Sequence, residues 1–462
     1  MSDRNQAIVF GASMGGLLAA RALADFFEQV TVLERDNFPP MGEARKGVPQ
    51  GRHTHVLLIG GQEVLEALFP GLTADLTSRG AQLLARPETE LVWFDGGGYH
   101  ARFANDGERV GALGVSRPLL EGYVRQRLLA LPNVRAVEQC DVLGLVPSER
   151  GSRVRGVRIL RRANGSAEEV LEADLVVDAS GRGSRGPKWL EAMGYAPPEE
   201  ETVTINVGYA TRLYRRPPEH RDGLKAIVIT ASPTLKRLGV MLAIESDRWM
   251  VSLGGFAGDH PPLDEEGFLS YARSLPAPDI YNVITGAEPL SEPFPYRFKA
   301  SLRRRYERLS HFPEGYLAFG DAICSFNPIY GQGMSVAAIE ALDLQHELRQ
   351  GTEGLWRRFF LRAAKSIDNP WQIAVSSDLR FPEVEGKRTP GMRLINAYMP
   401  WLHRAAHRDP VVARTFQDVV GLIEPPQSLI RPRILWRVLR GNLGSVAGSS
   451  ALARPGDGGT VL

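Results

Sequence analysis

Cysteine is scarce in this chain, because Cys140 and Cys324 are the only two among 462 residues. Two thiols exclude a disulfide framework, and neither cysteine stands at the spacing of a metal site. We therefore expect two small buried residues in a reducing compartment, and no bound metal.

Long apolar runs are also missing, since none approaches the roughly 20 residues that a membrane span needs. The formal net charge of +2 gives no electrostatic argument for a nucleic-acid partner. No signal peptide precedes the first motif, so we expect a cytoplasmic protein. The basic amphipathic segment from Ser428 to Asn442 leaves peripheral membrane contact open, although we favour a terminal helix packed on the body with its arginines in solvent.

The strongest motif opens the chain. A short apolar run from Ala7 to Phe10 is followed by a glycine-rich turn, a helix-forming stretch and a second apolar run that ends at Glu34. This order of strand, turn, helix, strand and acid is typical of a dinucleotide-binding βαβ unit. Glu34 can accept hydrogen bonds from an adenosine ribose.

Each residue of the turn has a physical role. Gly11 allows the tight bend, and Gly16 lets helix and strand pack closely. The backbone N–H groups between them, with the helix N-terminus, can face a pyrophosphate. Ser13 occupies the position of the usual middle glycine.

Two further acids end apolar segments later in the chain. The segment from Leu171 to Asp178 is predicted to be one strand, and the segment from Tyr316 to Asp321 a buried parallel strand. Asn327-Pro328 and the turn Gly331-Gln332-Gly333-Met334 follow, before a helix predicted to run to Leu348. A helix N-terminus after such a turn can stabilise negative charge on a ligand.

These three motifs, in this order, resemble the FAD-dependent monooxygenases of the aromatic-hydroxylase and squalene-epoxidase type, over roughly Ile8 to Glu340. The resemblance implies that Asp321 accepts hydrogen bonds from the ribityl chain and that Pro328 lies near the reactive face of the flavin. Arg125 is the favoured phosphate-reaching arginine of its helix, with Arg117 and Arg127 as competitors. The cofactor-binding residues it assigns are Gly11, Ser13, Met14, Gly15, Gly16, Glu34, Arg35, Arg45, Arg125, Asp141, Asp321, Gly331, Gly333 and Met334.

The resemblance and the strand pattern together predict an α/β fold. A Rossmann-like FAD-binding domain is expected to be interrupted by a sheet-rich substrate domain and followed by a helical C-terminal region. The expected limits are 1–80, 105–199 and 299–350 for the FAD-binding domain, 81–104 and 200–298 for the substrate-binding sheet, 351–442 for the helices, and 443–462 for a disordered tail.

The resemblance also implies a reaction. In that family NADPH or NADH reduces FAD, and dioxygen then forms a flavin C4a-hydroperoxide that transfers one oxygen atom. No second Rossmann unit is present for the nicotinamide, so we expect it to dock transiently. A flavin or ferredoxin reductase is the alternative electron source.

Four segments resemble bacterial epoxidases that act on polyketide polyenes: Arg45 to His55, Ser116-Arg117, Asp178 to Arg182 and Asp378 to Pro382. They imply an epoxidase for an apolar polyketide or isoprenoid-like alkene, free or carrier-bound. The alternatives are a phenol hydroxylase of the same fold, a prenyl reductase and a non-catalytic flavin-binding protein. A flavin halogenase is disfavoured because no W-x-W-x-I-P segment occurs.

The protein residues that would assist the reaction are less defined. Epoxidation needs no base, whereas a phenol hydroxylase benefits from one, and the candidates are His53, His55 and Tyr209. Aromatic residues of the C-terminal third are candidates for the substrate pocket, with an ordinary place in the core as the alternative; they are Trp371, Phe381, Tyr398 and Trp401.

Overall fold

The computed structural model describes residues 5–105, 107, 111–162, 168–220 and 223–443. The predicted disordered tail, 443–462, lies outside the described residues except for Leu443. Within the described ranges, no helix combines the length and apolar character that crossing a membrane requires.

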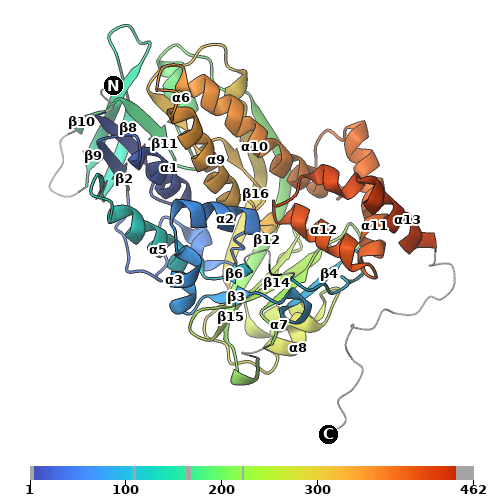
Figure 1. The fold of residues 1–462 in the computed structure, drawn as a ribbon. Coiled ribbons are helices and arrows are strands. Elements are labelled where there is room, and N and C mark those ends of the chain that lie inside the picture. The colour runs from blue at the N-terminus through green and yellow to red at the C-terminus, as the bar shows by residue number, and fades with distance from the viewer. Residues whose placement is uncertain (1–4, 106, 108–110, 163–167, 221–222, 444–462) are drawn as a thin grey trace.

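A five-stranded parallel sheet, in the order β17-β11-β1-β2-β7, forms the centre of the nucleotide-binding part (Figure 1). Its strands are Tyr316–Ala318, Leu175–Asp178, Gln6–Phe10, Gln29–Leu33 and Val134–Val137. The three central strands are short runs of apolar residues that are almost wholly buried, as expected for a parallel sheet covered on both faces.

The nucleotide-binding part also contains helices α1 (Met14–Ala24), α2 (Ile59–Leu68), α3 (Leu72–Ser78), α5 (Arg117–Leu129), α6 (Gly186–Ala192), α9 (Gly333–Leu348) and α10 (Leu355–Asp378). Helices α1 and α5 pack on strands of the parallel sheet, and further helices pack on α1 or on one another beside it. α5 begins as predicted, because the Ser116 side chain accepts a hydrogen bond from the Leu119 N–H and Pro118 lies in the first turn.

The prediction of one strand from Leu171 to Asp178 is wrong. Glu168–Glu172 forms β10 in a small antiparallel sheet with β9 (Val154–Arg161) and β8 (Cys140–Pro147), whereas β11 belongs to the parallel sheet. Between them the Asp174 carboxylate accepts hydrogen bonds from the backbone N–H groups of Asn5 and Gln6, both at 3.0 Å. This contact with the start of β1 separates the two strands.

The second large sheet has eight strands in the order β18-β16-β12-β15-β14-β13-β4-β5. In that order they are Cys324–Ser325, Phe294–Arg304, Glu200–Arg215, Arg248–Gly255, Arg237–Ile244, Ala226–Ile229, Leu91–Asp95 and Gly98–Tyr99. Two helices, α7 (Glu265–Arg273) and α8 (Asp279–Ile284), pack on this sheet through an apolar cluster that includes Trp249 and Phe268. The sequence pattern indicated only strands here, because these helices are short.

Smaller elements complete the chain. They are β3 (Gln82–Leu84) paired with β6 (Ala112–Gly114), α4 (Pro87–Glu90), and 3-10 turns at Pro49–Arg52, Pro218–His220, Tyr306–Arg308, Gly320–Ala322, Pro328–Tyr330 and Pro426–Ile430. The C-terminal helices α11 (Pro390–Ala406), α12 (Pro410–Val420) and α13 (Pro432–Leu443) share an apolar cluster of their own, to which α13 contributes Ile434 and Val438.

The order of the parallel strands decides where the site forms. β1 has β2 and β11 as neighbours, and β17 lies next to β11. The chain leaves these strands at Gly11, Glu34, Asp178 and the turn before Asp321, so all four positions lie at one edge of the sheet. Segments far apart in the sequence thus meet at a single site.

Candidate cofactor site

The glycine turn after β1 is tight on one side and open on the other. Gly11 has φ +93°, and a Cβ on Gly16 would lie 1.7 Å from the Gly11 carbonyl oxygen, so no side chain fits at residue 16. A Cβ on Gly15 would meet nothing nearer than Phe319 at 3.9 Å. No side chain caps the N-terminus of α1. The turn therefore presents free N–H groups on its open side, as a pyrophosphate requires.

Glu34, the acid at the end of β2, is buried and fully engaged. Its Oε2 accepts hydrogen bonds from the Ala12 N–H at 2.8 Å and from Arg45 Nη1 at 3.0 Å, and its Oε1 accepts one from the Asp36 N–H at 3.1 Å. Arg35, the next residue, is exposed. Glu34 is thus held at the turn, while the Arg35 side chain makes no contact with Glu34 that the structure describes.

Asp141, one of the cofactor-binding residues that the resemblance assigns, lies in β8. Its carboxylate forms a bidentate pair with Arg162 at 2.6 and 2.7 Å, and the preceding Cys140 N–H donates to the Glu34 carbonyl oxygen at 2.9 Å. The backbone at Asp141 is therefore close to the end of β2.

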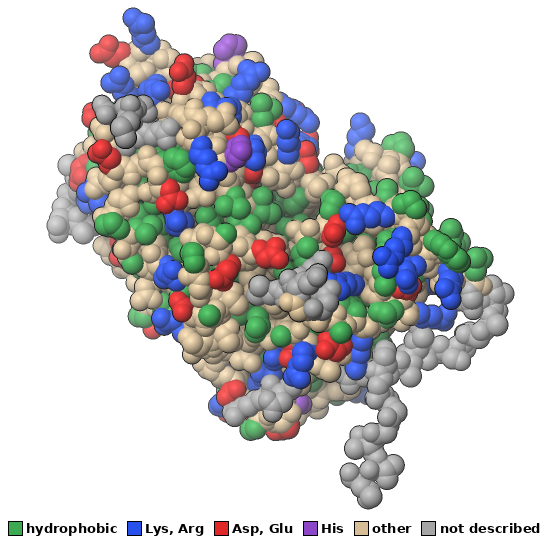
Figure 2. Space-filling model, viewed as in Figure 1, with side chains coloured by type: hydrophobic (Ala, Val, Ile, Leu, Met, Phe, Trp, Pro, Cys, Tyr) green, Lys and Arg blue, Asp and Glu red, His purple; other side chains and the backbone are tan. Residues whose placement is uncertain are grey.

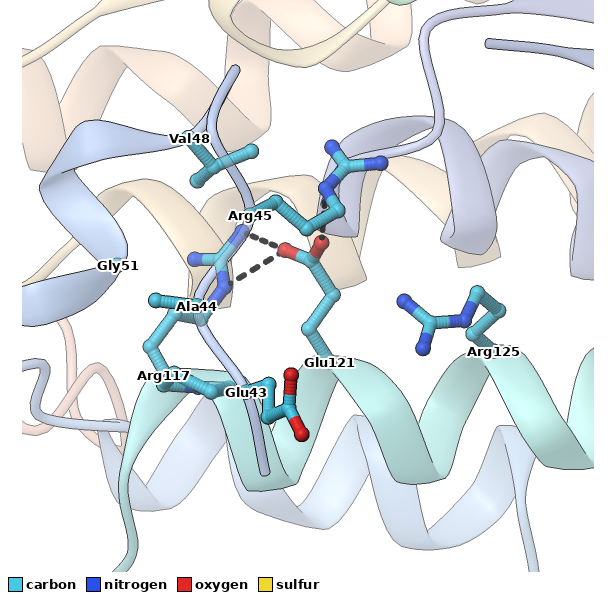
Figure 3. Close-up of a pocket in the computed structure, with 9 residues that line it drawn as sticks. Glu43, Ala44, Arg45, Val48, Gly51, Arg117, Glu121 and Arg125 are labelled. Carbon is cyan, nitrogen blue, oxygen red and sulfur yellow. Dashed lines mark hydrogen bonds and ion pairs between the residues drawn. The ribbon is translucent and has the colours of Figure 1, made fainter. Parts of the chain in front are cut away.

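Buried arginines converge beside the glycine turn (Figure 3). Arg45 Nε lies 3.1 Å from Glu121 Oε1, and Arg117 donates to Glu121 Oε2 from Nε at 3.0 Å and from Nη2 at 2.9 Å. Arg117 Nη2 also donates to Ser13 Oγ at 2.9 Å. The turn is thus linked directly to Arg117 and, through Glu34 and Glu121, to Arg45, and guanidinium groups bind phosphate oxygens well.

The arginine candidates occupy different places along α5. Arg117, named as a competitor of Arg125 from the sequence, makes the contact with the turn through Ser13. Arg125 lies two turns further along α5, where it donates to the Pro39 carbonyl oxygen at 2.6 Å and covers the ring of Phe38 at 4.7 Å. The signal that could have favoured Arg117 is its place at the helix start, four residues before Glu121.

Asp321 follows β17 in the 3-10 turn Gly320–Ala322, and its side chain is exposed. Desolvation by the protein packed around it raises its pKa to about 6, against the opposing charges of Arg117 and Arg182. Among the described residues, no group donates a hydrogen bond to this carboxylate. A carboxylate in such a place can accept hydrogen bonds from the hydroxyls of a ligand.

Two buried acids hold the segments beside Asp321. Glu340 in α9 accepts a hydrogen bond from the Gly320 N–H at 2.8 Å, and burial raises its pKa to about 8. Asp378 at the end of α10 accepts hydrogen bonds through Oδ1 from Asn327 Nδ2 and from the Tyr330 hydroxyl, both at 2.8 Å. Its pKa rises to about 7 because it is buried. Asp378 thus anchors both ends of the turn that contains Pro328.

The N-terminus of α9 faces the same place. Gly331 has φ +66°, which only glycine adopts easily, and no side chain caps the helix that begins at Gly333. A Cβ on Gly333 would lie 3.8 Å from Asp321 Oδ1. Met334, in the first turn, is buried. The free carboxylate and the uncapped helix therefore stand side by side.

The three candidate bases lie at the second sheet. His53 Nδ1 is 2.8 Å from Thr211 Oγ1, its ring packs edge-on against Tyr209, and burial lowers its pKa to about 4. His55 is also held at low pKa, about 3, by burial and by Arg117. Burial raises the pKa of Tyr209. Both imidazoles are therefore neutral and weakly basic at pH 7.

The aromatic residues proposed as lining occupy different places. Trp371 and Phe381 are buried in the main core, where Phe381 stacks on Phe256 at 4.0 Å. Tyr398 donates to the Leu429 carbonyl oxygen within the C-terminal helices, and Trp401 is 45% exposed. Helix α11 leaves the Trp401 side chain partly at the surface, which is not the ordinary core position named as the alternative; a place in the substrate pocket stays a prediction.

These features fit FAD: an open glycine turn at a helix start, arginines beside it, and a free carboxylate at a second, uncapped helix. The fold is that of the flavin-dependent monooxygenases, as predicted. The chain superposes on flavin-dependent brominase Bmp2 with a TM-score of 0.65, 14% identity, and coverage of 95% of this chain and 98% of that one. PqsL, a probable FAD-dependent monooxygenase from Pseudomonas aeruginosa, gives a TM-score of 0.58 at 18% identity, covering 81% and 98%.

A sequence relative identifies the family more closely. Protein Rv3254 of Mycobacterium tuberculosis (strain ATCC 25618 / H37Rv) is 33% identical over 457 residues, which cover 96% of this chain and 94% of the relative. The chain belongs to the same family as Protein Rv3254. No protein-family model matches it.

Proposed function

We propose that the protein binds FAD and acts as a monooxygenase that consumes dioxygen and NADPH or NADH. The observation that carries this proposal is the Asp321 carboxylate, which has no hydrogen-bond partner in the described part of the chain and lies next to the uncapped start of α9. FAD, when bound, supplies the hydride and oxygen chemistry. Asp321 would hold the ribityl chain, Arg45, Arg117 and Ser13 the pyrophosphate end, and the N–H groups of α9 the negative charge of the reduced ring.

The proposed reaction is epoxidation of an alkene in an apolar polyketide or isoprenoid-like substrate. The candidate bases support this choice over phenol hydroxylation, because imidazoles with pKa values of about 4 and 3 take a phenolic proton poorly. An alkene attacks an electrophilic oxygen without losing a proton, so it needs no base. The fold alone does not distinguish epoxidation from phenol hydroxylation, because proteins with different reactions, a brominase and a probable monooxygenase, share this fold.

A product assay separates these reactions. Protein loaded with FAD, with NADPH or NADH, dioxygen and a model triene should yield a product one oxygen atom heavier with one alkene fewer. His53→Gln should keep most of this rate, whereas a phenol hydroxylase that used His53 as its base would lose roughly 100-fold or more.

Other outcomes would replace the proposal by a named alternative. Oxidation of phenols with no reaction of alkenes would indicate an aromatic hydroxylase. A product that forms only with bromide would indicate a halogenase. A product in which an alkene has been reduced would indicate a prenyl reductase. Turnover that requires an added flavin or ferredoxin reductase indicates a partner protein. Failure of every donor to reduce the bound FAD indicates a non-catalytic flavoprotein.

We also propose a cytoplasmic protein whose C-terminal surface contacts anionic membranes. Helices α11 and α13 expose large apolar side chains, among them Leu394 (74%), Trp436 (60%) and Leu443 (76%). Arginines gather around them in Figure 2, and Arg433 and Arg440 on α13 are exposed. Apolar and basic side chains on one helical surface favour an interface with acidic lipid headgroups.

Vesicle sedimentation tests this contact. The protein should bind phosphatidylserine-containing vesicles and be released by salt, and Trp436→Ala should weaken binding several-fold, because Trp436 contributes a large share of the apolar surface. Leu361→Ala, at an exposed position of α10, is the matched control. Equal vesicle binding by Trp436→Ala and Leu361→Ala would contradict membrane contact. A wild-type dimer that Trp436→Ala dissociates would also contradict it, because a second copy of the chain would then cover this surface.

A further inference from the structure

Three side chains of the kind that bind metals meet where the C-terminal helices lie against the edge of the eight-stranded sheet. Asp95 ends β4, His100 follows β5, and His403 lies in the last turn of α11. One ligand atom from each residue lies within 4.8 Å of the others, and all three residues are buried. The cluster is separate from the flavin site, because its residues take no part in the contacts around Asp321 or the glycine turn.

The imidazoles in this cluster lack partners. Neither ring nitrogen of His100 or of His403 has a hydrogen bond among the described residues, although only 6% and 1% of these residues is exposed. The nearest polar group to His403 is Asp95, whose Oδ2 lies 3.3 Å from Nδ1. Buried polar groups without partners are costly, so an additional bound group is expected here. Arg380 is the nearby positive charge that a cation bound in this cluster would face.

The surroundings hold the ligands in place. Thr230 Oγ1 donates to Asp95 Oδ1 at 2.6 Å, and His407, one turn after His403, places Nε2 2.8 Å from the Asp95 carbonyl oxygen. A Cβ on Gly96 would lie 2.6 Å from His403 Cβ, and one on Gly98 would lie 2.6 Å from the His407 ring. The glycines therefore allow the β4–β5 turn to approach α11 closely, and secondary contacts orient the carboxylate.

We propose that Asp95, His100 and His403 bind one Zn²⁺ ion, with water in the fourth position. Two imidazoles and a carboxylate form a donor set that Zn²⁺ prefers. The ion would fasten α11, and the helices packed on it, to the sheet edge, where the Ala101 N–H already donates to the Ala406 carbonyl oxygen at 2.8 Å. The sequence predicted no metal, because Asp95 and His100 are far from His403 in the sequence and show no metal-ligand spacing with it.

The test uses the full-length protein with its cofactor, stripped of metal by a chelator and titrated with Zn²⁺. We expect one Zn²⁺ per chain, a higher melting temperature with Zn²⁺ than without, and visible absorption bands when Co²⁺ replaces it. His100→Gln and His403→Gln should weaken Zn²⁺ binding at least tenfold and leave the FAD content unchanged. His311→Gln, at an exposed position, should bind Zn²⁺ like the wild type.

The Zn²⁺ and Co²⁺ titrations of the wild type need no variant, so a folding defect in the variants does not affect them. The proposal is overturned if the wild type binds no stoichiometric Zn²⁺, or if well-folded His403→Gln binds it equally. The cluster would then be a buried Asp95–His403 pair, with Phe416 packed against His403 and Trp93 stacked on His100.

Discussion

Replacing Asp321 with alanine should lower the affinity for FAD by roughly 10- to 100-fold without destabilising the flavin-free protein. Hydrogen bonds to a charged group contribute about 1.5–3 kcal/mol, and each 1.4 kcal/mol corresponds to about tenfold in affinity. The carboxylate has no hydrogen-bond donor among the described residues, so its removal breaks no such contact within the protein. Fluorescence titration with FAD measures the affinity, and thermal unfolding of the flavin-free protein measures the stability.

The raised pKa of Asp321 gives the stability prediction a pH dependence. The carboxyl binds its proton more tightly in the folded protein, with a pKa of about 6, than in an unfolded chain, where it is about 3.9. The contribution of this carboxyl to the free energy of unfolding is therefore fully present below its unfolded pKa and is lost as the pH rises through its folded pKa of about 6. Asp321→Ala has no carboxyl to ionise and so avoids this loss of stability. The flavin-free variant should therefore be at least as stable as the wild type at pH 7.5.

Glu292→Ala, at an exposed carboxylate of a loop, is the matched control and should leave FAD affinity unchanged. Asp321→Asn keeps the shape but not the charge, and it should lie between the wild type and the alanine variant. Wild-type affinity in Asp321→Ala would exclude Asp321 as a cofactor ligand. A large loss of stability would show that the carboxylate supports the fold.

Replacing Gly16 with alanine should destabilise the protein by about 3 kcal/mol or more and abolish FAD retention. The new Cβ would lie 1.7 Å from the Gly11 carbonyl oxygen and 3.3 Å from Ala179 Cβ, so α1 must move away from β1. Overpacking of this kind typically costs 1–3 kcal/mol when flexible side chains give way, and here the obstacle is backbone. Urea unfolding of the flavin-free protein and the flavin absorbance of purified protein measure the two effects.

Gly15→Ala is the neighbouring control. Its Cβ would meet no atom closer than 3.9 Å, and alanine is a better helix former than glycine, so the flavin-free protein should be as stable as the wild type or slightly more so. The same Cβ would occupy the open side of the turn, and FAD should bind more weakly. If Gly15→Ala retained full affinity, the pyrophosphate would not pass over this face of the turn.

Much of the fold could be predicted from local patterns. The glycine turn, the strands on either side of it and the capped start of α5 depend on residues that are neighbours in the sequence, so their signals are local. The same reasoning predicted the strand before Asp321 and the helix after Met334. It failed between Leu171 and Asp178, because the break there depends on a contact of Asp174 with the start of the chain.

The site was predictable only in part, and its cofactor contacts stay predictions. The sequence pointed to Asp321 and Gly333, because both stand at the ends of regular elements. It could not show that Asp378 anchors the Pro328 turn or that Glu340 holds Gly320, since each contact joins segments 20 or more residues apart. Nor could it show that Arg117 contacts Ser13 while Arg125 contacts Pro39, because both arginines lie on the same helix and differ only in what surrounds them.

By itself, then, the sequence determined the regular elements and the open glycine turn, because backbone conformation and hydrophobic periodicity are set by nearby residues. The tertiary structure alone decided which charged groups are free and which are paired. Among the residues that the structure describes, Asp321 has no hydrogen-bond donor while Glu34 has three, and Asp95 lies next to His403, which is distant from it in the sequence. Whether a charged side chain finds a partner depends on how segments distant in the sequence pack together, so a local sequence pattern cannot predict it.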